Sequence, residues 1–278
     1  MFPCISQATT MSTPFGDDLP AFARAGFAGV ELWLTKLETF LESHSPREAA
    51  NLLADLGLHA AAAAGQGGLL LATGEERRET WDHYRRRLDL LAELRVPILV
   101  VAADPAPGAA IRDYPRAAES LAEAAELARN AGVRIALEFR KGSGICACLE
   151  TATALVVESG AANAGVCLDL FHYYTGPSKF EDLGLLTRDM LAWVQLSDVS
   201  GTPREVAGDA DRILPGDGDF RVGPVLDHLA GIGYDGGVSL ELLNPSLWSI
   251  PPGFVADLGF QAMARVLGRA ATVPDGDA

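Results

Sequence analysis

Short apolar runs alternate with longer amphipathic segments along the whole chain. The short runs are rich in β-branched, aromatic and small apolar residues, a composition typical of strands. Eight of them are present: Phe2–Ser6, Gly29–Trp33, Leu58–Ala64, Pro97–Ala103, Val133–Phe139, Ala164–Leu170, Ala192–Ser197 and Gly237–Leu242. Ile98–Val101 is hydrophobic on both faces, as a parallel strand covered by helices must be.

Between these runs, apolar residues recur at helical spacing and predict eight helices. They span Asp17–Ala25, Pro46–Leu56, Glu75–Leu94, Tyr114–Ala131, Leu149–Ser159, Glu181–Met190, Val222–Gly231 and a last segment near Phe254–Gly268. Eight strand–helix units in 278 residues predict a single-domain (β/α)8 TIM barrel over residues 1–271, with 272–278 as a flexible tail. A doubly wound sheet is the alternative.

The formal charge of −15, from 37 acidic and 22 basic residues, argues against a nucleic-acid ligand. By itself the charge favours a soluble acidic surface over a cation site. No apolar run approaches the roughly 20 residues that span a bilayer, and no signal peptide is evident, so we expect a cytoplasmic protein that does not bind membranes. The four cysteines match no disulfide framework.

Polar side chains end four consecutive predicted strands, at the barrel rim where catalytic groups gather. They are Glu138, Asp169, Gln195 and Glu241, each flanked by apolar neighbours. One such carboxylate is ordinarily just the point where a strand reaches water. Three together repel one another unless a cation or a shared proton neutralises them. The oxygen-rich set suits Mn2+ or Mg2+ better than Zn2+ or Co2+.

Five motifs in order resemble the xylose isomerase-like TIM barrel superfamily, which includes sugar phosphate isomerases/epimerases, inosose-processing enzymes and 3-dehydroshikimate dehydratases. They are Leu137-Glu138, Asp169-Leu170-Phe171-His172, Gln195-Leu196-Ser197-Asp198, Arg212-Ile213-Leu214-Pro215-Gly216-Asp217-Gly218 and Leu240-Glu241. The family's commonest residue at position 195 is His. The Gln in this chain also resembles the dehydratase branch.

The resemblance implies one divalent metal ion held by Glu138, Asp169, Gln195 and Glu241. It also implies that Glu138 and Glu241 remove and return a proton through a cis-enediolate intermediate. The expected activity is a metal-dependent isomerase or epimerase of a keto-sugar or related polyol. A dehydratase sharing that intermediate is the alternative, and a non-catalytic sugar-binding barrel is a third reading. A similar DNA-repair branch is His-rich and basic, whereas this acidic chain has five His.

Further residues near the strand ends are candidates for binding a small carbohydrate or polyol substrate: His172, Arg212, Lys141 and Trp248. Arg140, Glu31 and His59 are weaker candidates, and His59 is better explained as a core residue. Similar barrels often form dimers or tetramers, so a homo-oligomer is an open expectation.

Overall fold

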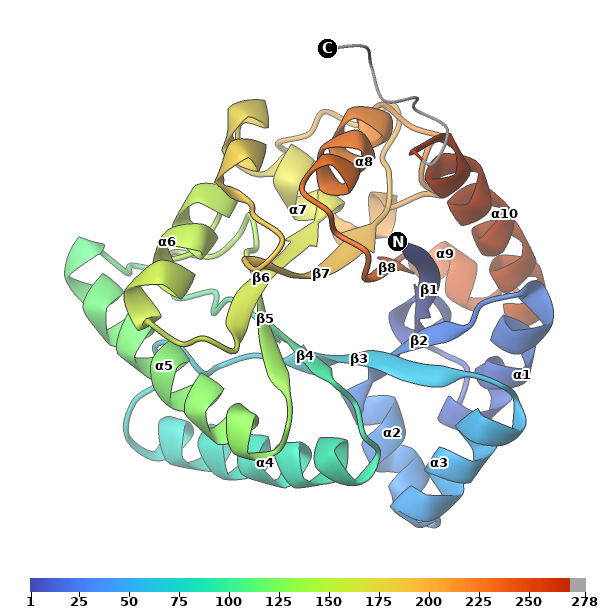
Figure 1. Ribbon diagram of the computed structural model, residues 1–278, viewed down its shortest axis with the longest axis horizontal. Coiled ribbons are helices and arrows are strands. Elements are labelled where there is room, and N and C mark those ends of the chain that lie inside the picture. Colours follow the sequence, from blue (N-terminus) through green and yellow to red (C-terminus); the bar gives the residue numbers. More distant parts are fainter. Residues whose placement is uncertain (271–278) are drawn as a thin grey trace.

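Eight parallel strands close into a barrel in the computed structural model, which describes residues 1–270 (Figure 1). The strands are β1 (Phe2–Ser6), β2 (Gly29–Trp33), β3 (His59–Gln66), β4 (Ile98–Ala102), β5 (Arg134–Glu138), β6 (Ala164–Asp169), β7 (Leu191–Leu196) and β8 (Gly237–Leu240). Each pairs with the next, and β8 pairs with β1 to close the ring. The predicted (β/α)8 barrel is confirmed, while the predicted tail at 272–278 lies outside the described residues.

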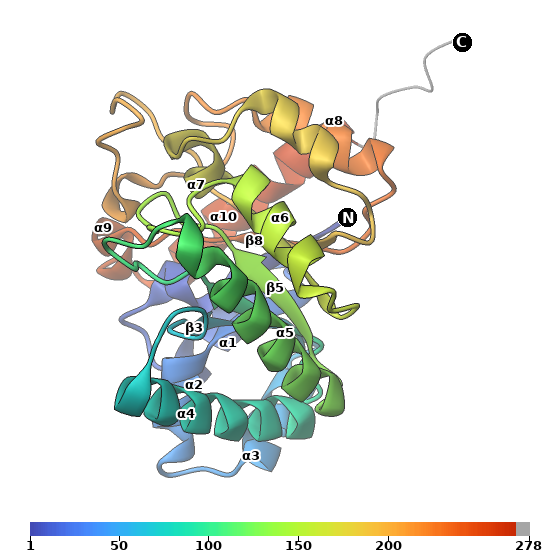
Figure 2. The same ribbon diagram turned by 90° about the vertical axis from the view of Figure 1, so that its left-hand side faces the viewer.

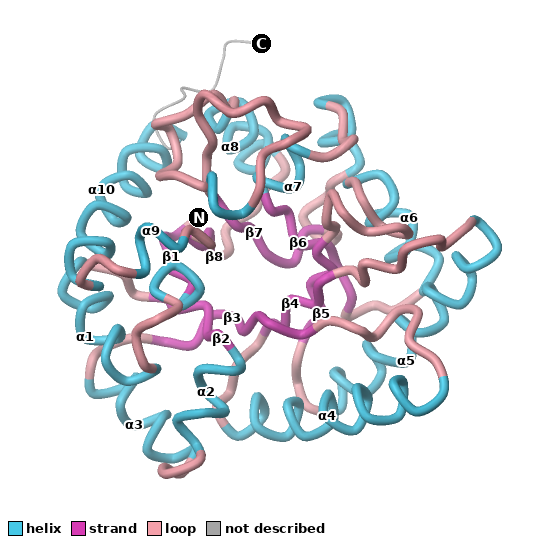
Figure 3. The backbone as a smooth tube through the Cα atoms, turned by 180° about the vertical axis from the view of Figure 1, so that it is seen from behind, coloured by secondary structure: helices cyan, strands magenta, loops and turns pink. Residues whose placement is uncertain are grey.

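Helices surround the strands on the outside of the barrel (Figures 2 and 3). They are α1 (Phe15–Ala25), α2 (Leu34–Leu41), α3 (Pro46–Asp55), α4 (Gly74–Glu93), α5 (Tyr114–Asn130), α6 (Leu149–Ser159), α7 (Leu170–Thr175), α8 (Val222–Gly231), α9 (Pro245–Trp248) and α10 (Pro252–Ala270). Four 3-10 turns, η1 to η4, span Gln7–Thr10, Ile111–Asp113, Phe180–Leu185 and Asp209–Asp211. Within the described part of the chain, none of the helices has the length and apolar character to cross a bilayer.

The prediction of a helix over Glu181–Met190 was wrong. Only its first part lies in the short 3-10 turn η3, which ends at Leu185, and Leu186 already has extended backbone angles. A glycine inside the segment weakens helix formation. The helix that follows β6 is α7, which starts directly at the strand end because the Asp169 carboxylate accepts a hydrogen bond from the Phe171 backbone N–H. This early helix decides the position of His172.

Small side chains and one tryptophan fill the barrel interior below the strand ends. They include Cys4, Ala62, Ala64, Val100, Ala136, Cys167 and Trp193, all buried. Trp193 needs the room left by Gly237, where an added Cβ would lie 2.7 Å from the indole ring. This packed layer is the floor of the candidate site.

Candidate metal and catalytic site

The four polar residues predicted at the strand ends form one layer above this floor. Because side chains alternate along a strand, Glu138, Asp169 and Gln195 point inward like Ala136, Cys167 and Trp193 two residues earlier. Asp169 and Gln195 are register partners, and Glu241 directly follows β8. All four residues are buried, with exposed fractions of 9% or less. The barrel therefore gathers the predicted residues at one end.

Glu138, Asp169 and His172 form a cluster of candidate metal ligands. One ligand atom from each lies within 4.8 Å of the other two. The His172 Nε2 atom is 3.7 Å from Glu138 Oε1 and 3.8 Å from Asp169 Oδ2. Because Asp169 is the N-cap of α7, His172 lies about one helical turn later and on the same side as the Asp169 carboxylate. His172, predicted to contact substrate, is thus placed with the candidate metal ligands.

Arg212 lies inside this cluster and is fully buried. Its guanidinium donates to Asp169 Oδ2 at 2.8 Å and to Glu241 Oε2 at 3.1 Å. It also pairs with Asp209 at 3.1 Å and stacks 4.3 Å from the centre of the Phe171 ring. The sequence predicts substrate contact for Arg212, whereas in the structure this side chain is held by protein carboxylates.

The loop carrying Arg212 is held by Asp198, the last residue of the Gln195–Asp198 motif. The buried Asp198 carboxylate accepts backbone N–H groups of Val199, Gly216 and Phe220 at 2.9, 3.0 and 2.9 Å. Close packing continues at Gly218, where an added Cβ would lie 2.3 Å from Asp198 Oδ1. The motif that resembles the family therefore fixes the loop from which Arg212 enters the site.

Gln195 presents its amide N–H2 group to two carboxylates. Nε2 donates to Glu31 Oε1 and Glu241 Oε1, both at 3.0 Å, while Oε1 accepts from Cys167 Sγ at 3.1 Å. An amide binds a metal ion through its oxygen. In this orientation Gln195 bridges carboxylates, and its role as a metal ligand stays a prediction.

Glu31 on β2 is a larger part of the site than the sequence indicates. Its fully buried carboxylate accepts the Trp193 indole N–H as well as the Gln195 amide. A Glu inside an apolar strand is the only sequence signal for it. Glu31 on β2 thus holds the side chain of Gln195, which projects from β7 into the barrel interior.

The buried site contains more acidic groups than basic ones. Four buried carboxyl groups, those of Glu31, Glu138, Asp169 and Glu241, share one buried guanidinium, that of Arg212. Burial and the charge of Asp169 raise the pKa of Glu138 to about 8. Burial likewise raises the pKa values of Glu31 and Glu241.

The pKa values of Asp169 and His172 are lowered. Burial would raise the pKa of Asp169, but the charge of Arg212 and the hydrogen bonds from Arg212 and from the Phe171 backbone N–H outweigh it and lower that pKa. Burial lowers the pKa of His172 to about 4, so its imidazole is neutral at pH 7 and available as a ligand or donor.

Two observations show that the donor set fits a divalent cation. The Glu138 carboxylate accepts no hydrogen bond from any described residue, although it is 9% exposed. The His172 Nε2 atom faces the Glu138 and Asp169 carboxylates at 3.7 and 3.8 Å and makes no hydrogen bond with another described residue. Buried polar atoms are rarely left unpaired without a functional reason. Carboxylate oxygens and imidazole nitrogens are ordinary ligands of divalent ions.

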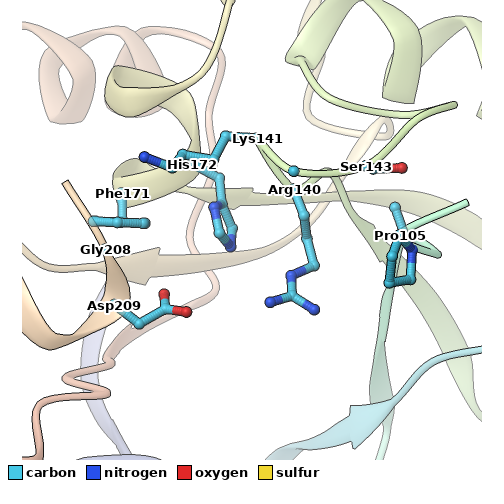
Figure 4. Close-up of a pocket in the computed structure, with 10 residues that line it drawn as sticks. Pro105, Arg140, Lys141, Ser143, Phe171, His172, Gly208 and Asp209 are labelled. Atoms are coloured by element: carbon cyan, nitrogen blue, oxygen red, sulfur yellow. The ribbon is translucent and has the colours of Figure 1, made fainter. Parts of the chain in front are cut away.

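Two adjoining cavities open above the cluster. One, of about 270 Å³, is lined by Glu138, Glu241 and His172 on one side and by Trp33 and Gln66 on another. The second, of about 260 Å³, is lined by Lys141, Phe171 and Asp209 among others (Figure 4). Arg140 and His172 line both cavities. A small molecule in this space would touch the candidate catalytic carboxylates directly.

The remaining predicted residues are placed differently. Lys141 lines the second cavity, but its ammonium donates to the backbone carbonyls of Ala207 and, at 3.4 Å, Arg204. Trp248 lines neither cavity; its indole N–H donates to the Ala8 carbonyl at 3.0 Å. His59 is the first residue of β3, at the opposite end of the barrel, and is exposed instead of part of the core.

Comparison with known proteins gives the family. A family model described as "Xylose isomerase-like TIM barrel" matches residues 19–266. The chain belongs to this family. It is 28% identical over 244 residues to a 3-dehydroshikimate dehydratase of Pseudomonas aeruginosa, covering 87% of this chain but only 38% of that protein. It is 25% identical to an inosose isomerase of Bacillus velezensis, covering 89% of this chain and 90% of that protein.

Solved structures show the same fold. A crystal structure of the IOLI protein with a zinc atom superposes with a TM-score of 0.92 at 22% identity, covering 98% of this chain and 100% of that one. A D-psicose 3-epimerase superposes with a TM-score of 0.77 at 20% identity, covering 96% and 100%. These relatives include a dehydratase, an isomerase and an epimerase.

Proposed function

We propose that this family member is a divalent-metal-dependent enzyme that enolises a small keto-polyol, with isomerisation or epimerisation as the outcome. The observation that carries the proposal is the Glu138 carboxylate. It faces the cavity without a hydrogen bond, within ligand spacing of Asp169 and His172. The isomerase and epimerase among its relatives support this class of reaction.

Glu138, Asp169 and Glu241 would hold the metal ion, with His172 or the Gln195 oxygen as a further ligand. When bound, the ion would withdraw electrons from the substrate carbonyl and stabilise the negative charge that develops on its oxygen. The three carboxylates favour Mn2+ or Mg2+. The His172 nitrogen and the zinc atom of the similar IOLI structure support zinc as well, so reconstitution must compare all three ions.

Glu138 is the proposed proton acceptor. Its oxygens are free of protein donors, and burial, which raises the pKa of this carboxyl, makes the carboxylate a stronger proton acceptor. The C–H electron pair moves toward the carbonyl carbon as the proton leaves, giving an enediolate. Glu241, held by Arg212 and Gln195, would in its protonated form deliver a proton to the opposite face of the same carbon, which gives the epimer. Delivery to the former carbonyl carbon, with transfer of the substrate's hydroxyl proton to the other oxygen, gives the isomer.

Dehydration is the second candidate outcome. The same enediolate can expel a β-hydroxyl group, which leaves as water after taking a proton from one of the two glutamic acids. The similarity to a 3-dehydroshikimate dehydratase over 87% of this chain supports this branch. In both outcomes the first step is removal of the α-proton by the same residue.

Deuterium exchange separates these outcomes and tests the role of Glu138. The metal-loaded chain is incubated in deuterated water with an inosose or with 3-dehydroshikimate. Label at the α-carbon without a conjugated product indicates isomerisation, and growth of ultraviolet absorbance indicates dehydration. Glu138→Gln is expected to slow either reaction by about 10²- to 10⁴-fold. Glu126→Gln, an exposed carboxylate paired with Arg129, is the control. Full turnover by Glu138→Gln would remove the residue from the mechanism.

A further inference from the structure

Arg140 carries a positive charge that forms no ion pair with a described residue. It follows β5 by two residues and is only partly exposed. Its backbone is fixed, because the N–H donates to the Cys146 carbonyl at 3.0 Å and the carbonyl accepts the Ser143 N–H at 2.7 Å. The guanidinium itself has no hydrogen bond or ion pair with residues 1–270 and extends into the open space of the cavity (Figure 4).

The neighbouring cations differ from Arg140 in this respect. Lys141 is held by backbone carbonyls of the loop carrying Arg204 and Ala207, and in Figure 4 its side chain runs away from that of Arg140. The charge of Arg212 is paired with the carboxylates of Asp169 and Glu241. Among the basic residues lining the two cavities, Arg140 therefore has its positive charge free for a ligand.

The surroundings of Arg140 leave room for an anion. Apolar or backbone surfaces of Ala103, Pro105 and Gly142 form much of the cavity wall. Two carboxylates are nearby. Asp209 pairs with Arg212. The charge of Arg140 acts on Glu138 at longer range, but the two side chains form no ion pair. A guanidinium is a rigid fork of donors that binds a carboxylate or phosphate through two parallel hydrogen bonds.

Arg140 also lies close to Glu138, the proposed proton acceptor. It is two residues beyond Glu138, so in an extended chain their Cα atoms are roughly 7 Å apart on the same side. Both residues line the same cavity, together with Glu241. One six-membered ring could thus place its carbonyl beside Glu138 and a ring substituent beside Arg140.

We propose that Arg140 forms an anion subsite, and that the substrate is an acidic keto-polyol whose carboxylate or phosphate group binds there. The inference rests on the proposed function for the reaction, and it adds the substrate class. An inosose is neutral, whereas 3-dehydroshikimate carries a carboxylate, so Arg140 favours the acidic substrate of the two.

Equilibrium binding tests the subsite without requiring turnover. Calorimetry with the Mn2+-loaded chain compares three unreactive or slowly reacting probes: shikimate, glucose 6-phosphate and the neutral myo-inositol. Arg140→Met is expected to weaken binding of the preferred anion by roughly 10- to 100-fold, the loss typical of a charge-assisted pair of hydrogen bonds. Arg140→Lys should keep part of the affinity. Arg188→Met, a remote surface arginine paired with Asp235, is the control and should bind like wild type.

The outcomes separate the subsite from the reaction. Arg140-dependent binding of shikimate assigns a carboxylate, and Arg140-dependent binding of the sugar phosphate assigns a phosphate. Either result supports the anion subsite, even when no ketone is turned over. Absence of turnover would count against the proposed reaction and not against the subsite. Failure of the wild-type chain to bind either anion overturns the subsite. Equal affinity of wild type and Arg140→Met does the same, even if inosose is enolised normally.

Discussion

Replacing Arg212 by Met is the sharpest perturbation of the buried charge cluster. The guanidinium is fully buried and bridges Asp169 and Glu241, which are 0% and 4% exposed at their side chains. Met has similar length but no charge, so the variant leaves both carboxylates buried without their cation. Removing one partner of a buried ion pair costs about 3–5 kcal/mol.

The expected change in thermal stability follows from that range. In a chain of this size each kcal/mol moves the unfolding midpoint by roughly 2–4 °C, so the metal-free variant should unfold about 10 °C lower than wild type. Differential scanning calorimetry in EDTA measures this shift. The control, Arg188→Met, breaks an ion pair whose side chains are 59% and 78% exposed and should change stability by less than about 0.5 kcal/mol.

Metal addition gives the second half of this test. Asp169 and Glu241 lose their resident cation in Arg212→Met, so a divalent ion should stabilise the variant more than it stabilises wild type. Two results would show that Arg212 and a metal ion do not neutralise the same carboxylates. One is a loss of unfolding free energy below about 1 kcal/mol in EDTA, and the other is an equal stabilisation of both proteins by Mn2+.

Three further predictions concern single side chains. Gln195→His should bind zinc more tightly than wild type in a chelator competition, since imidazole suits zinc better than an amide; unchanged zinc affinity would place position 195 outside the metal site. Burial opposes the ionisation of Glu38, but hydrogen bonds from an arginine and a histidine lower its pKa below the ordinary 4.5. The ionised Glu38 therefore stabilises the fold above about pH 4.5, and this stabilisation is lost as the pH falls through the lowered pKa. Wild type should lose free energy of unfolding between about pH 5 and 3. In Glu38→Gln this loss should be smaller, by less than about 1 kcal/mol, as measured by urea unfolding. Gly237→Ala should cost about 1–3 kcal/mol by crowding Trp193, whereas Gly223→Ala, with open space around it, should not destabilise.

The barrel was predictable because its strand signals are repetitive and local. Short apolar runs, each followed by a segment of helical spacing, occur eight times, and the positions at the strand ends then identify Glu138, Asp169, Gln195 and Glu241 together. Those four residues share one buried layer in the structure. Closure of the ring brings them together, so a correct strand count was sufficient.

Details of the site depended on loop direction, which local patterns do not encode. Arg140 and Lys141 are adjacent in sequence, yet one enters the cavity and the other is tied to a distant loop. The start of α7 is set by a side-chain cap, and it moves His172 from a loop position into the ligand cluster. Trp248 follows β8 as expected but turns toward η1, where it donates to Ala8.

The proposed reaction depends most directly on a divalent ion bound by Glu138, Asp169 and Glu241. Calorimetric titration of chelator-treated chain with Mn2+ measures that binding independently of any substrate. We expect one ion per chain, with binding strongly weakened in Glu138→Gln because the variant loses a charged ligand that faces the cavity without a protein partner. Absence of binding at millimolar Mn2+, Mg2+ and Zn2+, or equal binding by wild type and Glu138→Gln, would contradict it.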